Sequence, residues 1–305
     1  MHEGSRRAII AALLANLGIA VSKVIAFLLT RSASMLAEAI HSFADTGNQA
    51  LLIFGGRRAQ RAADDEHPFG HGSERYFWAF MVALVLFTLG GLFAIFEGVE
   101  KLRHPHELDS PIIAVIVLAI AIILESFSLR TAVREATPSR HGRSWRRFIR
   151  ETRNPELPVV LLEDVGALTG LVLALVGVGL AWTTHEPRWD ALGSIAIGSL
   201  LCVIAIVLAI EMKSLLIGES ADPEATTAVR TAILAGPEAR SIIHMRTLHL
   251  GPEEILVAAK LEMTADDLAS IATGIDAIEA RVRNAVPEAT IIYLEPDLLR
   301  EIAAE

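Results

Sequence analysis

Six long stretches of mostly apolar residues fill the first two thirds of the chain. An α-helix needs about 20 such residues to cross a hydrocarbon core of ~30 Å. A buried helix of a soluble protein can imitate one such stretch, but six in succession predict a membrane domain built only from helices. The predicted spans cover residues 8–30, 34–56, 77–99, 111–130, 157–182 and 190–213.

The composition supports a membrane protein and excludes several other classes. Hydrophobic residues make up 52% of the 305 residues and charged residues only 21%, and the mean hydropathy is +0.46. The formal net charge of −9 comes largely from the part after Ser220, so the chain offers no basic face and we expect no nucleic-acid partner. With Cys202 as the single cysteine, any metal must be held by histidine and carboxylate groups.

Arginine and lysine residues predict the orientation in the bilayer. They crowd the N-terminus, the loop between the second and third spans and the connection between the fourth and fifth, which all lie on one side. The positive-inside rule places these segments, and both termini, in the cytoplasm. No small-residue cleavage site follows the first apolar run, which we therefore interpret as a retained span. We expect a multi-pass protein of the bacterial plasma (inner) membrane.

The pattern changes after Glu219, which divides the chain into a transmembrane domain, residues 1–219, and a cytosolic domain, residues 220–305. Short alternating stretches and turn signals in the second domain predict an α+β unit of order α-β-β-α-β. Its expected elements are a helix with N-cap Asp222 and Pro223 in its first turn, strands 241–250 and 255–263 joined as a hairpin, a helix capped by Thr264 that runs to about Val286, and a strand 290–294.

Closely spaced ionisable residues stand out within two of the predicted spans, the second and the fifth. His41 and Asp45 in the second span are four residues apart, so they share one helical face. Glu163 and Asp164 are adjacent within the fifth span. Such groups are costly at membrane depth, and imidazole and carboxylate ligands suit a divalent transition metal. One interpretation is that His41, Asp45 and Asp164 meet in a hydrated cavity, and the other is that each bonds a neighbouring helix or a buried water.

The loop between the second and third spans has a composition that can chelate a metal. Residues 64–72 read DDEHPFGHG and concentrate two imidazoles and three acids within a turn shaped by proline and glycine. A charged loop is also common as a merely solvated segment, so its composition alone leaves both readings open.

At this point several segments resemble one family, the cation diffusion facilitators, and especially its branch of mitochondrial-type zinc transporters. The resemblance lies in SASMLAEAIHSFADTGNQ, DDEHPFGHG, the pair Glu163 and Asp164, and MRTLHLGPEEILVAAKLEM. It implies a homodimeric transporter, not an enzyme, with six transmembrane helices and a ferredoxin-like cytosolic domain. Such a transporter exports a divalent metal, Zn²⁺ as first choice, in exchange for protons, and needs no cofactor besides the transported ion.

The resemblance also implies which residues bind metal. His41 and Asp45 match the motif on the second helix, and Asp164 matches the last acid of the motif on the fifth. Val160 stands where the family often has histidine or aspartate. Either Glu163 replaces that ligand, which requires a rotated or distorted helix because adjacent residues point about 100° apart, or the site has three ligands and water. Losing an imidazole weakens the preference for zinc and leaves Mn²⁺, Fe²⁺ or Co²⁺ as alternatives.

In the loop, Asp64, His67 and His71 match a second metal site of the family. In the cytosolic domain, Ile243, Lys260 and Tyr293 stand where some members have zinc ligands, so the resemblance predicts that this domain chiefly dimerises. Two other classes stay open as alternatives. A non-transporting metal sensor or scaffold would bind metal without flux, whereas an intramembrane metallohydrolase is disfavoured because the chain has no HExxH motif.

Overall fold

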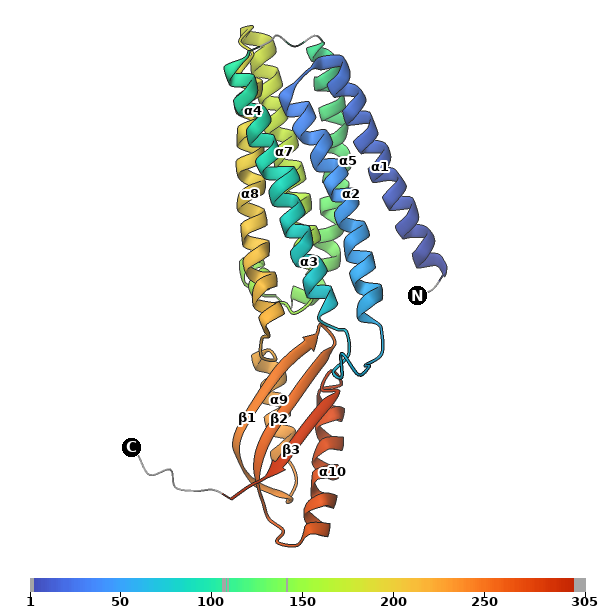
Figure 1. Cartoon of the computed structure of the whole chain (residues 1–305), viewed down its shortest axis with the longest axis vertical. Helices are drawn as coiled ribbons and strands as arrows, with labels where there is room; N and C mark the ends of the chain where they lie inside the picture. Colours follow the sequence, from blue (N-terminus) through green and yellow to red (C-terminus); the bar gives the residue numbers. More distant parts are fainter. Residues whose placement is uncertain (1–2, 106–107, 109, 141, 299–305) are drawn as a thin grey trace, which may run out of the picture. The chain divides into compact units, whose positions relative to one another are not determined.

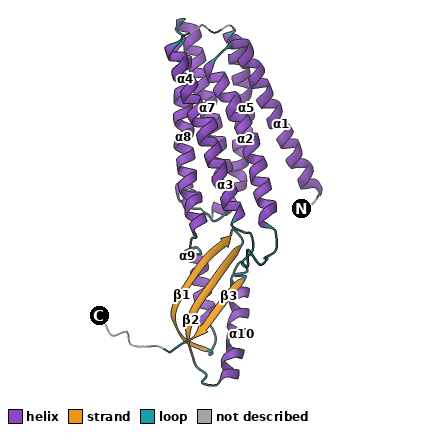
Figure 2. Cartoon of the chain, viewed as in Figure 1, coloured by secondary structure: helices purple, strands orange, loops and turns teal. Residues whose placement is uncertain are grey.

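The computed structural model describes residues 3–105, 108, 110–140 and 142–298, with side chains from residue 17 onward. The chain forms two compact units (Figures 1 and 2). The first unit contains the residues up to 56 together with 77–213, and the second contains 57–76 together with 214–305. The second unit therefore includes the loop that follows the second predicted span.

The first unit is a bundle of long helices that run side by side (Figure 1). Each of the six predicted apolar segments is helical, and the segment at residues 74–103 contains a π-helical turn, η1, between two α-helical parts. The helices are α1 (Glu3–Thr30), α2 (Ala33–Ala59), α3 (Glu74–Val85), η1 (Leu86–Leu92), α4 (Phe93–Arg103), α5 (Pro111–Arg140), α6 (Trp145–Glu151), α7 (Glu156–Thr184) and α8 (Arg188–Ile217).

Four helical segments among the described residues are long and apolar enough to cross a membrane. They are Glu74–Arg103, Pro111–Arg140, Glu156–Thr184 and Arg188–Ile217. Large apolar side chains on these segments remain exposed, for example Phe96, Phe127 and Ile210. A soluble protein rarely exposes such extended apolar faces, whereas lipid chains solvate them. The first unit is therefore the helical part of a membrane protein.

Glycines let α8 approach its neighbours closely. A Cβ added to Gly91 of η1 would crowd the backbone of Gly198 on α8, and one added to Gly166 of α7 would lie 2.9 Å from Ile204 of α8. Small residues at such positions allow the van der Waals contact on which helix association in lipid depends. Gly166 thus allows α7 to approach α8 closely.

A buried polar network fixes the start of α2. The Asp190 carboxylate on α8 accepts hydrogen bonds from the backbone N–H of Ala33 at 2.8 Å and from the Ser32 hydroxyl at 2.7 Å. Lys101 of α4 donates to the same carboxylate at 2.9 Å, and both charged side chains are at most 1% exposed. A carboxylate at a helix N-terminus satisfies N–H groups that have no partner within the helix. The network ties α2, α4 and α8 together.

Replacing Lys101 by alanine should destabilise the bundle because the Asp190 carboxylate would stay buried without its counter-charge. Breaking a buried pair in this way costs about 3–5 kcal/mol. Thermal unfolding of the purified protein in detergent should show a clear drop in Tm. Lys213→Ala on the exposed side of α8 is the matched control and should leave Tm unchanged, and an equal Tm for both variants would contradict the role of the network.

The second unit contains a three-stranded sheet with two helices on one face (Figure 2). In the sheet, β1 pairs antiparallel with β2, and β2 pairs parallel with β3. Alternate residues of β2, such as Val257 and Leu261, pack against Ile233 and Ile278 of the helices. The predicted order α-β-β-α-β is confirmed. Its elements are α9 (Pro223–Leu234), β1 (Ala239–Gly251), β2 (Glu254–Met263), α10 (Leu268–Ala285) and β3 (Ile291–Pro296).

One of the two predicted helix caps in this unit is correct and the other is wrong. Asp222 caps α9 by accepting a hydrogen bond from the backbone N–H of Ala225. The cap of α10 is Asp267, which accepts from the N–H of Ser270, and not Thr264. The Thr264 hydroxyl donates instead to the carbonyl of Pro237 at 2.7 Å. Thr264 joins the end of β2 to the segment before β1, so the chain turns into the helix only afterwards.

Candidate functional site

A small polar cavity lies between the helices of the first unit. Its volume is about 30 Å³, which is enough for one water-sized particle. Four carboxylates belong to its wall, although the surrounding helices are apolar. The lining residues are Ile19 of α1, Ser42, Asp45 and Gln49 of α2, Glu125 and Ser128 of α5, and Val160, Glu163 and Asp164 of α7.

Asp45 faces the cavity from α2, with His41 behind it one helical turn away. Their Nε2 and Oδ2 atoms are 3.4 Å apart, which is ion-pair distance without the geometry of a hydrogen bond. The His41 imidazole is 1% exposed, and neither of its nitrogens has a hydrogen-bond partner. A Cβ at Gly90 of η1 would lie 3.8 Å from His41 Nδ1. His41 therefore sits between Asp45 and the π-helical turn, and it is not one of the lining residues.

Glu163 and Asp164 both face the cavity from α7. Glu163 accepts a 2.6 Å hydrogen bond from the Asn48 amide of α2, and Asp164 accepts one of 3.1 Å from the Ser128 hydroxyl of α5. The α-helix continues without interruption from Glu156 to Thr184. A rotated or distorted helix was the condition for Glu163 to replace the absent ligand. Local distortion is not needed for Glu163 to reach the cavity, because Glu163 and Asp164 both line it from a regular helix.

The sequence-predicted residues are brought together only in part. One cavity is lined by Asp45, Glu163 and Asp164. His41 does not line this cavity but contacts Asp45. No group of three ligand atoms from these residues lies within 4.8 Å in the described part of the chain. Glu125 and Ser128 of α5 also line the cavity, and neither was among the predicted ligands. The signal for Glu125 was present as a carboxylate within an apolar predicted span.

A buried ion pair lies next to the cavity. Lys23 of α1 is 3.1 Å from a Glu38 carboxylate oxygen on α2 and donates to the Ser42 hydroxyl at 2.7 Å. Both charged side chains are at most 1% exposed. A Cβ at Gly170 of α7 would approach the second Glu38 oxygen to 2.7 Å. Lys23 is thus paired with Glu38, and its charge also acts on Asp45 and Glu125 of the cavity.

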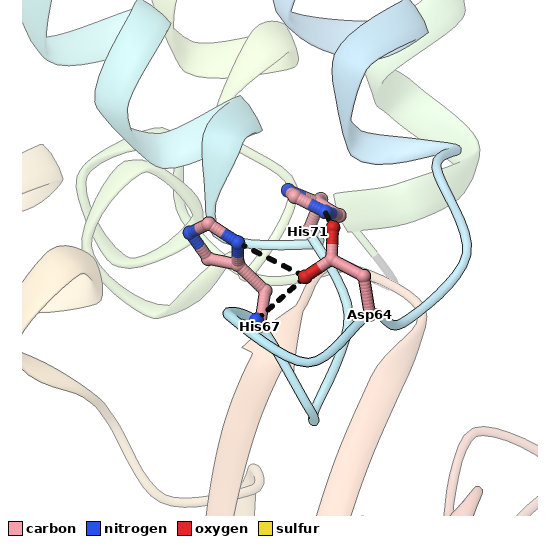
Figure 3. Close-up of side chains that lie close together, drawn as sticks. All are labelled: Asp64, His67 and His71. Carbon is pink, nitrogen blue, oxygen red and sulfur yellow. Dashed lines mark hydrogen bonds and ion pairs between the residues drawn. The ribbon is translucent and has the colours of Figure 1, made fainter.

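The loop between α2 and α3 holds a second group of ligand atoms, within the second unit. Single ligand atoms of Asp64, His67 and His71 all lie within 4.8 Å of one another (Figure 3). His71 Nε2 is 3.1 Å from one Asp64 oxygen, and His67 Nδ1 is 3.4 Å from the other. Two imidazole nitrogens and a carboxylate oxygen are typical ligands of zinc and related ions. The described residues contain no other group of three that meets this distance.

Hydrogen bonds and a glycine hold the loop in shape. An Asp64 oxygen accepts hydrogen bonds from the backbone N–H groups of His67 at 2.7 Å and Glu66 at 3.1 Å. The donation from the His67 backbone, together with the contact from His71, holds the pKa of Asp64 below its ordinary value. Gly70 has a φ of +85°, a conformation that glycine adopts without strain. Asp64 therefore stays ionised, as a metal ligand must be.

The same unit holds the loop against the turn between β1 and β2. A Cβ added to Gly72 would lie 2.8 Å from the Leu250 carbonyl oxygen, and Arg75 lies 3.6 Å from Glu253. In the sheet, Lys260 pairs with Glu295 at 2.8 Å and with Asp297 at 3.1 Å. Lys260 thus occupies the carboxylates that a metal in this region of the sheet would need.

Carboxylates around an internal cavity of a membrane bundle are the arrangement expected of a protein that binds a cation or protons within the bilayer. Residues 9–217 match the model of the cation efflux transmembrane domain. The chain therefore belongs to the cation efflux family, and the resemblance to the cation diffusion facilitators is confirmed.

The chain is also similar to individual curated proteins. It is 32% identical over 79% of its length to the human mitochondrial proton-coupled zinc antiporter SLC30A9, of which it covers 43%. It is 29% identical over 85% of its length to metal tolerance protein C4 of Arabidopsis thaliana, of which it covers 57%. It is 26% identical over 94% of its length to the cation-efflux pump FieF of Klebsiella pneumoniae, of which it covers 91%. The chain thus spans less than half of the SLC30A9 protein.

Removing an imidazole from the loop should weaken Zn²⁺ binding there. We expect His71→Ala to lower the affinity of the loop by at least about tenfold, because one of three ligands is lost. Isothermal titration of the purified protein with Zn²⁺, in an Asp45→Ala/Asp164→Ala background, isolates this site. His244→Ala on the exposed side of β1 is the control and should bind as the background does. An unchanged isotherm for His71→Ala would contradict the assignment of the loop as a Zn²⁺ site.

Proposed function

We propose that the protein exports a divalent transition-metal cation from the cytoplasm in exchange for protons, with Zn²⁺ as the first-choice substrate. Membership of the cation efflux family supports metal transport. The name of the SLC30A9 relative, a proton-coupled zinc antiporter, supports both the metal and the coupling ion. The FieF relative, which the chain covers almost completely, is named a cation-efflux pump.

One observation carries the proposal: Asp45 of α2 and Asp164 of α7 line the same cavity. Two carboxylates from helices far apart in the sequence face one water-sized space. Ionised carboxylates have a high free energy within the membrane unless they bind a cation or a proton. We assign Asp45, Asp164 and Glu163 as carboxylates of the transport site. His41 is the imidazole that joins them when the helices move.

Competition between metal and protons is the proposed basis of coupling. A carboxylate or imidazole must be deprotonated to bind a metal, so binding releases protons and protonation expels the ion. The ligand atoms of His41 and of the α7 acids do not lie together in this conformation. Rocking of α2 against α7 would gather them on one side of the membrane and separate them on the other.

The proposed architecture follows the family. We propose six membrane spans, with α1 and α2 added to the four segments described above, and both termini in the cytoplasm of a bacterial cell. Residues 1–219 form the transmembrane domain and residues 220–305 a ferredoxin-like domain that makes the homodimer. The αββαβ order, with both helices on one face of the sheet, supports this assignment. Asp64, His67 and His71 form a second metal site.

The chemistry of the cavity bears on the choice of metal. Its donors are carboxylate oxygens, and His41 is the one imidazole beside it among the described residues. Oxygen-rich sites suit Mn²⁺, Fe²⁺ or Co²⁺ as well as Zn²⁺, so these ions are the alternative substrates. A non-transporting metal sensor or scaffold is the alternative in another class. The grouping of Asp64, His67 and His71 in the loop favours a sensor or scaffold. A metal bound in the loop needs no pathway through the membrane.

Flux measurements on purified protein in liposomes test the proposal directly. Asp45→Ala and Asp164→Ala should each abolish Zn²⁺ flux, together with the proton flux that opposes it, because each removes a carboxylate of the transport site. Glu135→Ala, an exposed acid near the end of α5, is the control and should transport normally. A metal-sensitive and a pH-sensitive dye inside the vesicles report the two fluxes.

Two outcomes would contradict the proposal. Normal flux in either aspartate variant would refute the assigned site. Metal binding without any flux in the unaltered chain would support the sensor or scaffold instead. Size-exclusion profiles of each variant establish that a loss of flux is not a loss of folding.

A further inference from the structure

We propose that Glu125 of α5 is a ligand of the transported cation, so that the transport site draws carboxylates from three helices and not two. This inference rests on the proposed transport function. It assigns to α5 a direct role in holding and selecting the metal.

The position of Glu125 supports this role. It lines the cavity together with Asp45 of α2 and Asp164 of α7. It lies close enough to Lys23, Asp45, His41 and Asp164 for their charges to interact. Ser128, three residues further along the same face of α5, donates its hydroxyl to Asp164. One side of α5 thus faces the acids of the other two helices.

The surroundings of Glu125 in the sequence make its charge costly. It is the one charged residue between Pro111 and Leu129. Its neighbours Ile123, Leu124 and Phe127 are between 45% and 62% exposed, as expected for side chains that face lipid. A carboxylate in such a helix is a functional candidate by default.

Glu125 also lacks the partners that its neighbours have. Glu163 is bonded to Asn48, Asp164 to Ser128, and Glu38 to Lys23. For Glu125, the described part of the chain provides no hydrogen bond and no ion pair. Its oxygens are therefore available to a cation in the cavity, whereas one oxygen of Glu38 is held by Lys23.

The atoms around the cavity point independently to a missing ligand. His41 is fully buried with both nitrogens unpartnered, and one oxygen of Asp45 is buried without a hydrogen bond. Buried polar atoms are rarely left in this state unless a ligand, ion or water completes them. On the α7 side, Val160 contributes only an apolar surface. Glu125 of α5 adds a charged oxygen ligand to the cavity, where Val160 provides none.

Binding measurements with two metals test the assignment. All variants carry His67→Ala and His71→Ala, which remove two ligands of the loop site. Titration with Zn²⁺ and Mn²⁺ should show that Glu125→Gln weakens both metals by at least about tenfold. Glu125→His should regain Zn²⁺ affinity but not Mn²⁺ affinity, because an imidazole suits zinc better than manganese. Glu135→Gln, an exposed acid on the same helix, should match the background protein.

The outcomes separate a ligand from a structural residue and from a failure of the proposed function. Unchanged affinity and flux in Glu125→Gln would overturn the assignment, while the proposed function would stand if Asp45→Ala still abolished flux. If Glu125→Gln and Glu125→His both lost Zn²⁺ and Mn²⁺ affinity to the same extent, Glu125 would have a structural role. That result would also overturn its assignment as a ligand. Absence of flux in the unaltered chain would overturn transport itself, and the two-metal titration would then still decide whether Glu125 binds the ion.

Discussion

The constraint on which the rest of the first unit depends is the presence of four carboxylates around one small cavity inside an apolar bundle. Asp45, Glu125, Glu163 and Asp164 share this space, and no lysine or arginine is among the lining residues. Lys23, a lysine beside the cavity, is paired with Glu38. Charges of one sign cannot remain together in a medium of low dielectric constant without compensation. Protons or a metal cation can supply it, and the proposed antiport exchanges one for the other.

The bundle positions these groups through a few strong contacts. The Asp190 carboxylate, held by Lys101, fixes the N-terminus of α2, from which His41 and Asp45 follow within the next four turns. Small residues at Gly166 and Gly170 bring α7 close to α8 and to the Glu38 side chain. The π-helical turn η1 lies beside His41, and such turns are frequent at functional sites. A movement of α2 relative to α7 would therefore change the separation of the ligand atoms.

Several features could be predicted from the sequence because they depend on local patterns. The long apolar runs indicated the helices, Asp222 indicated a cap, and the spacing of His41 and Asp45 indicated a shared face. Other features depend on contacts between distant segments. Glu125 belongs to the cavity only because α5 packs against α7, and the loop around Asp64 belongs with the sheet only because Gly72 meets Gly251. Thr264 was a wrong cap because its hydroxyl donates to the distant Pro237 carbonyl, and the helix begins only after Asp267.

The most direct test of the central claim is to locate the metal. Anomalous scattering at the zinc edge, from crystals of the protein grown with Zn²⁺, shows where the ion binds without reference to activity. The cavity between α2, α5 and α7 should contain a peak within ligand distance of Asp45 and Asp164, about 2.0–2.2 Å from the coordinating oxygens. Peaks confined to the loop at Asp64, His67 and His71, with none in the bundle of a protein that still transports zinc, would contradict it.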